Sequence, residues 1–353
     1  MSEKPTLRWG IIATGMISSW FVADLVIDRP NAKANHIIQA IGSSSVEKGR
    51  SFVEQHLPGK SPTIYGSYEE VYAASDVDVV YIGTPHAFHK QNCLDAIRHG
   101  KHILCEKAFT LNAREAKEVF DAAKEKGVFV MEAMWTRHFP IIPALQKVLH
   151  EDKAIGKIHR AFCDFSLDQK IAERGPDSRL KNPALGAGSL LDIGVYSLTL
   201  VLLGLEPPVG TQSSPETPKV VAAQSLSDGV DIATSTILLY QDGRQGIATC
   251  HAGMKSPRDF CRIEGSEGTV VVQGTAASVP SAFTVKKLGS EEEKYDFEWP
   301  GRGFHWEADA VALEIAAGRT ESAVMPWSET IRVMEIMDEI RRQGGAKFPQ
   351  DAE

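Results

Sequence analysis

Cysteine is scarce in this chain, and its spacing excludes the common disulfide frameworks. The 353 residues include only five cysteines, at positions 93, 105, 163, 250 and 261, and no two of them form a Cys-x-x-Cys pair. Small secreted domains that depend on disulfides carry more cysteines in paired patterns. We therefore expect a protein of the reducing cytoplasm.

Excess positive charge and long apolar runs are also lacking. The 46 acidic residues outnumber the 38 basic ones, and the net charge of −8 argues against nucleic acid as the main partner. No segment approaches the ~18 consecutive apolar residues of a membrane span, and the N-terminal pattern is not that of a signal peptide. We therefore expect no nucleic-acid and no membrane partner. The length and the 43% hydrophobic content allow two domains with sizeable cores.

Residues 1–138 alternate between strand-like and helix-like patterns. Five short apolar segments have the composition of buried strands: 7–12, 36–42, 77–83, 102–105 and 128–132. Four helical segments separate them: 16–27, 46–57, 88–98 and 112–126. Asn112 is the expected N-cap of the last helix and Gly127 its C-cap. This alternation predicts an α/β domain with a doubly wound parallel sheet.

Residues 139–353 have a different pattern, in which strands follow one another. Strands are expected at 157–167, 234–240, 245–251, 260–264, 269–273 and 283–287. Helices are expected at 141–149, 189–203, 306–317 and 328–342. Clustered strands with glycine-rich turns predict an α+β domain with a large, mostly antiparallel open sheet. The C-terminal helix is a candidate to pack back on the first domain.

The loop after the first strand carries part of a dinucleotide-binding pattern. In the register Gly-x-Gly-x-x-Gly, this chain has Ala13, Gly15 and Ser18. The central glycine lets a pyrophosphate approach the N–H groups at a helix N-terminus. We expect this loop to bind a dinucleotide through these residues: Ala13, Thr14, Gly15, Met16 and Ile17.

The end of the second strand predicts which dinucleotide binds. An NAD site usually has Asp or Glu there, but this chain has Ser43, Ser44 and Ser45, with Lys48 just beyond. Hydroxyl groups and a nearby cation suit a 2′-phosphate, so we predict NADP. The alternative is a serine-rich turn before a solvated helix.

The third strand is followed by Thr84, Pro85, His86 and His89, which we expect at the mouth of the cofactor cleft. No further histidine or cysteine lies at metal-ligand spacing, so no metal site is expected.

Two more segments combine groups with acid-base chemistry. The strand at 102–105 ends in Glu106 and Lys107, at the sheet edge where parallel α/β proteins bind ligands. Further on, Asp192 and Tyr196 stand four residues apart on one expected helix face. The alternatives are a solvated ion pair at Lys107 and a core tyrosine at Tyr196. A lysine beside Tyr196 would let its phenol act as an acid or base near neutral pH.

These motifs together resemble the glucose-fructose oxidoreductase/inositol dehydrogenase (Gfo/Idh/MocA) family. The resemblance rests on residues 10–15, Glu106–Lys107, residues 132–137 and Asp192-x-Gly194-x-Tyr196. It is strongest to the dimeric dihydrodiol dehydrogenases and the fungal NADP-dependent D-xylose dehydrogenases, because Tyr196 stands where many members have His. Ala108 replaces the proline of the family's Glu-Lys-Pro motif.

The resemblance implies an N-terminal Rossmann domain and a dimer through the C-terminal sheet. It implies that Tyr196 is the acid/base, that Lys107 lowers its pKa and orients the substrate hydroxyl, and that Asp192 binds the sugar or the lysine. Trp135 and Arg137 would contact cofactor and substrate, and Glu106 the cofactor. Substrate would also meet Phe165 and Phe304, because aromatic rings give a sugar an apolar face.

The expected reaction is NADP-dependent oxidation of the anomeric hydroxyl of an aldose such as D-xylose to the lactone. One alternative is a trans-dihydrodiol dehydrogenase or a reductase of dicarbonyls or keto sugars. A more distant alternative is a non-catalytic regulatory protein that senses NADP, against which the presence of both Lys107 and Tyr196 argues.

Overall fold

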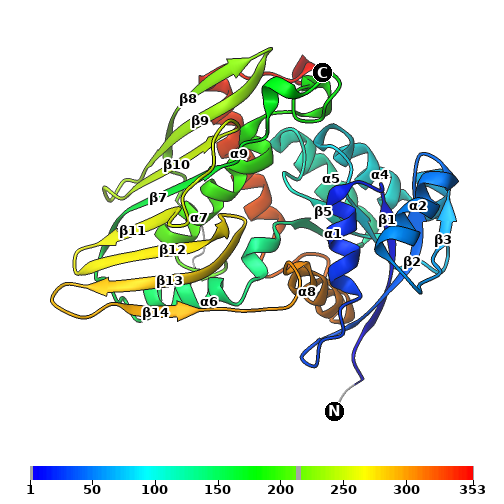
Figure 1. Ribbon diagram of the computed structural model, residues 1–353, viewed down its shortest axis with the longest axis horizontal. Coiled ribbons are helices and arrows are strands. Elements are labelled where there is room, and N and C mark those ends of the chain that lie inside the picture. Colours follow the sequence, from blue (N-terminus) through cyan, green and yellow to red (C-terminus); the bar gives the residue numbers. More distant parts are fainter. Residues whose placement is uncertain (1–2, 212–215, 353) are drawn as a thin grey trace. The chain divides into compact units, whose positions relative to one another are not determined.

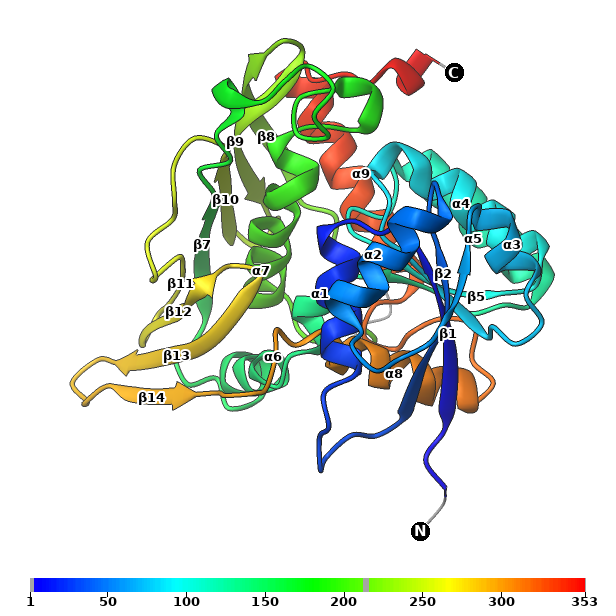
Figure 2. The ribbon, with the colours of Figure 1, turned by 45° about the vertical axis from the view of Figure 1, so that its right-hand side comes forward.

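The computed structural model describes residues 3–211 and 216–352, which form two compact units (Figures 1 and 2). Unit 1 contains the chain up to His138 together with Trp299–Ile331, and unit 2 contains Phe139–Glu298 together with the chain from Arg332. A division at residue 138 alone would place 299–331 in the second domain. That part of the expected division is wrong, because α8 (Phe304–Ala316) packs against α1 (Met16–Leu25) of unit 1.

Unit 1 contains the predicted doubly wound sheet of six parallel strands, in the order β3-β2-β1-β4-β5-β6. Its strands are β1 (Thr6–Ile12), β2 (Asn35–Gly42), β3 (Thr63–Tyr65), β4 (Val79–Ile82), β5 (His102–Glu106) and β6 (Val130–Ala133). Its other helices are α2 (Val46–His56), α3 (Tyr68–Ala73), α4 (His89–Arg98) and α5 (Ala113–Lys126). In Figure 2, α1 and α2 lie on one face of the sheet and α3, α4 and α5 on the other. The strand order reverses between β1 and β4, and such switch points open a ligand crevice.

Helix caps in unit 1 follow the sequence closely. The Asn112 side chain accepts the N–H of Glu115, and Gly127 ends α5 in the left-handed conformation, as predicted. The elements β3 and α3 were missed because three and six residues are too short to establish a periodic pattern.

The return of residues 299–331 to unit 1 depends on Asp24 of α1. Its carboxylate accepts the backbone N–H groups of Arg302, Gly303 and Phe304, with N···O distances of 2.7–3.0 Å. These are N–H groups at the start of α8, which have no partner within the helix. A carboxylate from α1 therefore caps α8 and fixes where it begins.

Unit 2 is built on one eight-stranded sheet, which Figure 1 shows with its helices on one face. The strand order is β14-β13-β12-β11-β7-β10-β9-β8, and every neighbouring pair except β7 and β10 is antiparallel. The bounds are β7 (Ile158–Ser166), β8 (Lys219–Ser227), β9 (Val230–Leu239), β10 (Gln245–His251), β11 (Cys261–Gly265), β12 (Gly268–Ala276), β13 (Val279–Lys287) and β14 (Glu293–Asp296). The predicted fold class is confirmed. Strand β14 was missed because polar residues dominate it, and β8 was missed because its apolar residues do not alternate clearly with polar ones.

The helices of unit 2 are α6 (Ile141–Gln146), α7 (Val195–Leu205) and the part of α9 (Trp327–Gly344) that lies beyond Ile331. Helix α7 packs on β7, β10 and β11. The absence of side chains at Gly204 and Gly246 allows this close approach, since a Cβ at Gly246 would stand 2.5 Å from Val201.

One helical stretch, Pro183–Leu205, is long and apolar enough to cross a membrane by length and composition, with a mean hydropathy of 1.7. The expectation that no segment approaches this length was therefore wrong. The stretch is a core segment, because 94% of its most apolar window is buried inside the protein.

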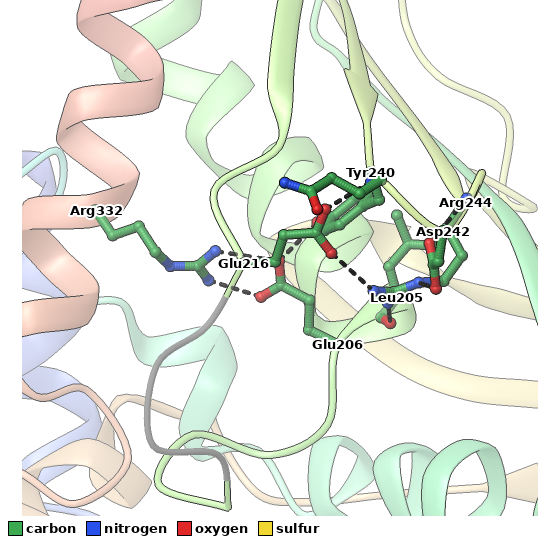
Figure 3. Close-up of polar contacts among 8 residues, drawn as sticks. Leu205, Glu206, Glu216, Tyr240, Asp242, Arg244 and Arg332 are labelled. Atoms are coloured by element: carbon green, nitrogen blue, oxygen red, sulfur yellow. Dashed lines mark hydrogen bonds and ion pairs between the residues drawn. The ribbon is translucent and has the colours of Figure 1, made fainter.

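A partly buried polar cluster joins the ends of α7 and β9 to α9 in unit 2 (Figure 3). The Glu206 carboxylate receives two hydrogen bonds from the Arg332 guanidinium, at 2.8 and 3.1 Å, and one from the Tyr240 hydroxyl at 2.6 Å. Arg244 packs over the Tyr240 ring and bonds to Asp242 and to the Leu205 carbonyl. The cluster fixes the start of the unit 2 part of α9.

We predict that Arg332→Met lowers the free energy of unfolding by about 3 kcal/mol, because it leaves the Glu206 carboxylate, whose side chain is only 13% exposed, without the Arg332 cation. The control is Arg342→Met on the same helix. Arg342 pairs with Glu339, but its side chain is 71% exposed, so the change should stay within about 0.5 kcal/mol. Urea unfolding measures both, and equal effects would contradict the role of the cluster.

Candidate active site

The loop between β1 and α1 leaves the start of the helix open. Ala13 adopts a left-handed φ of 76°, which is uncommon for a residue with a Cβ, and donates its N–H to the Gly42 carbonyl. Gly15 is the N-cap of α1 and gives it no side-chain cap, and a Cβ added at Gly15 would meet no atom within 4 Å. The first N–H groups of α1 therefore face open space, beside exposed Met16 and half-buried Ile17. An anion fits such a helix terminus.

Ser18, at the third position of the pattern, is buried against the next strand end. A Cβ at Gly83 would stand 2.5 Å from the Ser18 hydroxyl oxygen. The small residues Ser18 and Gly83 therefore allow α1 to pack closely on the sheet.

The three serines after β2 have three different roles. Ser43 is buried, and its hydroxyl lies 3.1 Å from the hydroxyl of Thr14 in the first loop. Ser45 caps α2 by accepting the Lys48 N–H. Ser44 is exposed and accepts a hydrogen bond from the Lys48 ammonium at 3.1 Å. Ser44 and Lys48 are therefore the pair that presents a hydroxyl and a cation to solvent.

The turn after β4 is held from behind by α4. The Asn92 side chain donates to the Thr84 hydroxyl at 3.0 Å, and Nε2 of His89 lies 2.8 Å from the Thr84 carbonyl. Pro85 is half-buried and the buried His86 packs edge-on against His89. Residues 3–211 and 216–352 contain no group of three or more His, Cys, Asp or Glu side chains that could hold a metal.

His89 was expected to contact the cofactor, and the structure places its ring in the interior of unit 1. Its ring is fully buried, and Nδ1 lies 3.1 Å from the Ala108 carbonyl and 3.2 Å from that of Phe109. Burial lowers the pKa of His89, and the nearby charge of Lys107 lowers it further. The ring connects two loops of the site and has no surface left for a ligand.

Glu106 and Lys107 end β5, but they differ in burial. The Glu106 carboxylate is buried and accepts the Tyr81 hydroxyl at 2.5 Å. Lys107 is half-buried, and the Lys107–Ala108 peptide bond is cis. Glu106 therefore faces the packed interior of the unit. Burial raises the pKa of the nearby Glu307 carboxyl, and the negative charge of Glu106 raises it further.

Trp135 and Phe304 were expected to line the substrate pocket. In unit 1 their rings stack with centroids 4.1 Å apart, and Phe304 also meets Phe21 edge-on. Phe21 in turn stacks on Tyr81 at 3.9 Å. Phe304 is only 1% exposed, so its position supports Trp135 rather than offering a face to a ligand.

Arg137 was expected to contact cofactor and substrate, and the structure places it elsewhere. It is buried, and its guanidinium donates to Glu329 of α9 at 2.5 Å. A buried arginine paired with a buried carboxylate joins the end of β6 to the returning segment 299–331. Its partner lies 192 residues away, so no local pattern could reveal it.

The residues expected to act on substrate in unit 2 lie at the start of α7. Asp192 belongs to a π-helical turn, Leu190–Gly194, and Tyr196 follows in the first turn of α7. π-helical turns inside helices are frequent at functional sites. The Phe165 ring of β7 packs edge-on against the Tyr196 ring, with centroids 5.6 Å apart. Thus the sheet orients Tyr196 while Asp192 stays partly exposed.

Asp192 has two hydrogen-bond partners that no sequence pattern predicted. The Gln169 amide donates to one carboxylate oxygen at 2.5 Å, and the Arg179 guanidinium donates to the other at 3.2 Å. Both come from the irregular segment between β7 and α7, which has no periodic pattern. The three side chains group a carboxylate, an amide and a half-exposed guanidinium.

A buried carboxylate, also missed, anchors this turn. Asp231 of β9 accepts the Leu190 N–H and the Ser189 hydroxyl, both at 2.7 Å. Burial raises the pKa of Asp231 to about 6. Asp231 thereby holds the helix start that carries Asp192 and Tyr196.

Comparison with known proteins gives the same family for both halves of the chain. Residues 7–134 match an oxidoreductase family with an NAD-binding Rossmann fold, and residues 145–271 match the GFO/IDH/MocA C-terminal domain. The chain is 37% identical to a D-xylose 1-dehydrogenase (NADP(+)) of Hypocrea jecorina, over 98% of this chain and 94% of that relative. It is 32% identical to a trans-1,2-dihydrobenzene-1,2-diol dehydrogenase of Bos taurus, over 98% and 99%.

Solved structures share the fold at lower identity. A levoglucosan dehydrogenase in complex with NADH and levoglucosan has a TM-score of 0.81 and 21% identity, covering 96% of this chain and 97% of that one. A 3-ketoreductase of Actinomadura kijaniata in complex with NADP has a TM-score of 0.79 and 21% identity, covering 96% and 98%.

Proposed function

We propose, because this chain belongs to the GFO/IDH/MocA oxidoreductase family, that it is an NADP-dependent dehydrogenase that oxidises the anomeric hydroxyl of an aldose such as D-xylose. The observation that carries the proposal is the retention of Lys107 at the end of β5 and of Asp192 and Tyr196 at the start of α7, in a chain 37% identical to a D-xylose 1-dehydrogenase.

The first loops of unit 1 fit NADP. The uncapped start of α1 and the open space at Gly15 suit a pyrophosphate, and Ser44 with Lys48 suits a 2′-phosphate. No Asp or Glu directly follows β2, where an NAD site usually has one, and the first carboxylate beyond it is the exposed Glu47 of α2. When bound, NADP supplies the acceptor for the hydride that the substrate carbon loses.

We assign the proton chemistry to residues of the chain. Tyr196 takes the proton from the C1 hydroxyl of the sugar, and the Lys107 ammonium stabilises the phenolate and orients that hydroxyl. Asp192, which Gln169 and Arg179 hold in place, accepts hydrogen bonds from substrate hydroxyls. The product is the lactone.

The cluster around Asp192 favours a sugar over an aromatic diol. A carboxylate, an amide and a guanidinium offer acceptors and donors for several hydroxyl groups, more than a vicinal diol on an apolar ring has. The identities to diol dehydrogenases keep trans-dihydrodiol oxidation as the second candidate.

We also propose a cytoplasmic homodimer that forms through the open face of the unit 2 sheet. Four apolar side chains occupy neighbouring register positions across it: Val221, Ile237, Ile247 and Phe162. Val221 and Ile237 are 41% and 39% exposed, and apolar rows of this kind favour protein contacts. The five cysteines are free and buried, which fits a reducing compartment.

We predict that Ile237→Lys shifts the protein from dimer to monomer in sedimentation velocity, because it places a charge in the centre of the apolar row. The control Leu288→Lys changes an exposed leucine that is not in this row and should leave the dimer intact. A wild-type monomer would contradict the proposed dimer.

We predict that Lys48→Ala raises the KM for NADP about tenfold or more and leaves the KM for NAD unchanged, because a charge-assisted hydrogen bond to phosphate is lost. The control is Lys60→Ala, which removes an exposed lysine beyond α2. Steady-state kinetics with both cofactors give the comparison. An equal effect on NAD would mean that Lys48 does not bind the 2′-phosphate.

We predict that Tyr196→Phe lowers kcat ~10²-fold or more while NADPH still binds, because the general acid/base is lost. The control is Tyr295→Phe on β14. Initial rates of NADP reduction are compared for D-xylose and a trans-dihydrodiol, and the rate of NADPH oxidation is measured with a dicarbonyl. Wild-type turnover in Tyr196→Phe would contradict the role of the phenol, and a protein that binds NADPH without turnover would contradict the enzyme assignment.

A further inference from the structure

The main chain directly after Lys107 is held by two buried side chains that the proposed chemistry does not use. Nδ1 of His89 lies 3.1 Å from the Ala108 carbonyl and 3.2 Å from the Phe109 carbonyl. An oxygen of the Glu132 carboxyl group accepts the Phe109 N–H at 3.2 Å. These contacts hold the backbone of the two residues that directly follow Lys107.

We propose that His89 and Glu132 are positioning residues that aim the Lys107 ammonium for hydride transfer, by clamping the backbone of Ala108 and Phe109 between the ends of β4 and β6. The proposal rests on the proposed function of Lys107. It adds two residues to the site, both of which are buried and act through the backbone after Lys107.

The other end of each contact lies in rigid structure. His89 begins α4, and its Nε2 lies 2.8 Å from the Thr84 carbonyl, so the ring lies between the loops after β4 and β5. In its neutral form the ring donates through one nitrogen, and the tautomer with the proton on Nδ1 holds the Ala108 and Phe109 carbonyls. Glu132 lies in β6, in register with Cys105 of β5. Phe109 itself stacks on Phe120 of α5, with centroids 4.7 Å apart. Three adjacent strand ends are thus joined at the residues that follow Lys107.

The burial of both clamp residues makes substitution informative. His89 is 0% and Glu132 is 1% exposed, so water does not replace their hydrogen bonds. A loosened backbone would move the ammonium of Lys107, and a displacement of about 1 Å at a reacting group can cost about 10²-fold in rate. The expected defect is therefore in kcat and not in cofactor binding.

Few titratable groups of unit 1 lie beside His89 and Glu132, the two residues that clamp the backbone after Lys107. Lys107 and the ring of His86 lie beside His89, and Arg137, Glu329 and the Cys105 thiol face Glu132. Burial raises the pKa of Glu132 to about 7, and Arg137 acts in the opposite direction. As pH rises through 7, Glu132 gains charge and accepts the Phe109 N–H more strongly. The clamp on Lys107 therefore tightens from pH 6 to pH 8.

The test compares Glu132→Gln, Glu132→Ala and His89→Phe with a matched control, His99→Phe, at the other end of α4. Glu132→Ala and His89→Phe should lower kcat for D-xylose about 10²-fold and change the KM for NADP less than about threefold. Glu132→Gln keeps an acceptor for the Phe109 N–H and should restore most of kcat. His99→Phe should behave as wild type.

The pH profile separates positioning from simple support of the fold. The ratio of the wild-type kcat to that of Glu132→Gln should grow between pH 6 and pH 8, because only the wild type gains charge at this position. A constant ratio, or a loss of NADP binding as large as the loss of kcat, would overturn the proposal.

The activity of Lys107→Met distinguishes a failure of the proposed positioning from a failure of the proposed function. If wild type oxidises D-xylose and Lys107→Met does not, the function of Lys107 stands, and unchanged kcat in both Glu132→Ala and His89→Phe refutes the clamp alone. If wild type lacks NADP-linked activity altogether, the proposed function fails first. Where His89→Phe does not fold, the two Glu132 variants decide.

Discussion

Much of unit 1 depends on one buried carboxylate, Asp24 in α1. It accepts three consecutive backbone N–H groups, which start α8 and bring residues 299–331 into the first unit. Burial raises the pKa of Asp24, and these N–H groups oppose that rise. This contact fixes the start of α8, where Phe304 stacks on Trp135 and meets Phe21 edge-on.

A buried ion pair between Arg29 and Asp309 also holds residues 299–331 in unit 1. Arg29 donates two hydrogen bonds to Asp309 of α8, both at 3.1 Å, and His36 of β2 lies 3.0 Å from the same carboxylate. These contacts hold the pKa of Asp309 at about 2. Breaking one partner of such a group is costly because the remaining charge stays buried. The strand ends that carry Gly15, Thr84 and Lys107 therefore rest on a framework built by distant residues.

The parts of the candidate site that depend on neighbouring residues in the chain could be predicted. The small residues at positions 13, 15 and 18, the missing carboxylate after β2, and Lys107 at the end of a buried strand all follow from neighbours in the chain. His89 and Arg137 could not be predicted correctly, because each looks like a polar residue at a strand end. His89 contacts the carbonyls of Ala108 and Phe109, which lie 19 and 20 residues further along the chain. Arg137 pairs with Glu329, which lies 192 residues further along. Gln169, Arg179 and Asp231 gave no signal, since isolated polar residues in irregular segments have no pattern.

By itself the sequence determined the doubly wound parallel sheet, the following mostly antiparallel sheet, the caps of α5 and the positions of Lys107, Asp192 and Tyr196 on their elements. Apolar periodicity, strand ends and capping residues are local properties, and short-range sterics and hydrogen bonds enforce them. Only the tertiary structure decided that residues 299–331 belong to unit 1 and that His89 and Arg137 face inward. It also decided that the backbone after Lys107 is held by His89 and Glu132. These outcomes depend on which buried polar groups find partners, and a partner far along the chain is known only once the chain has folded.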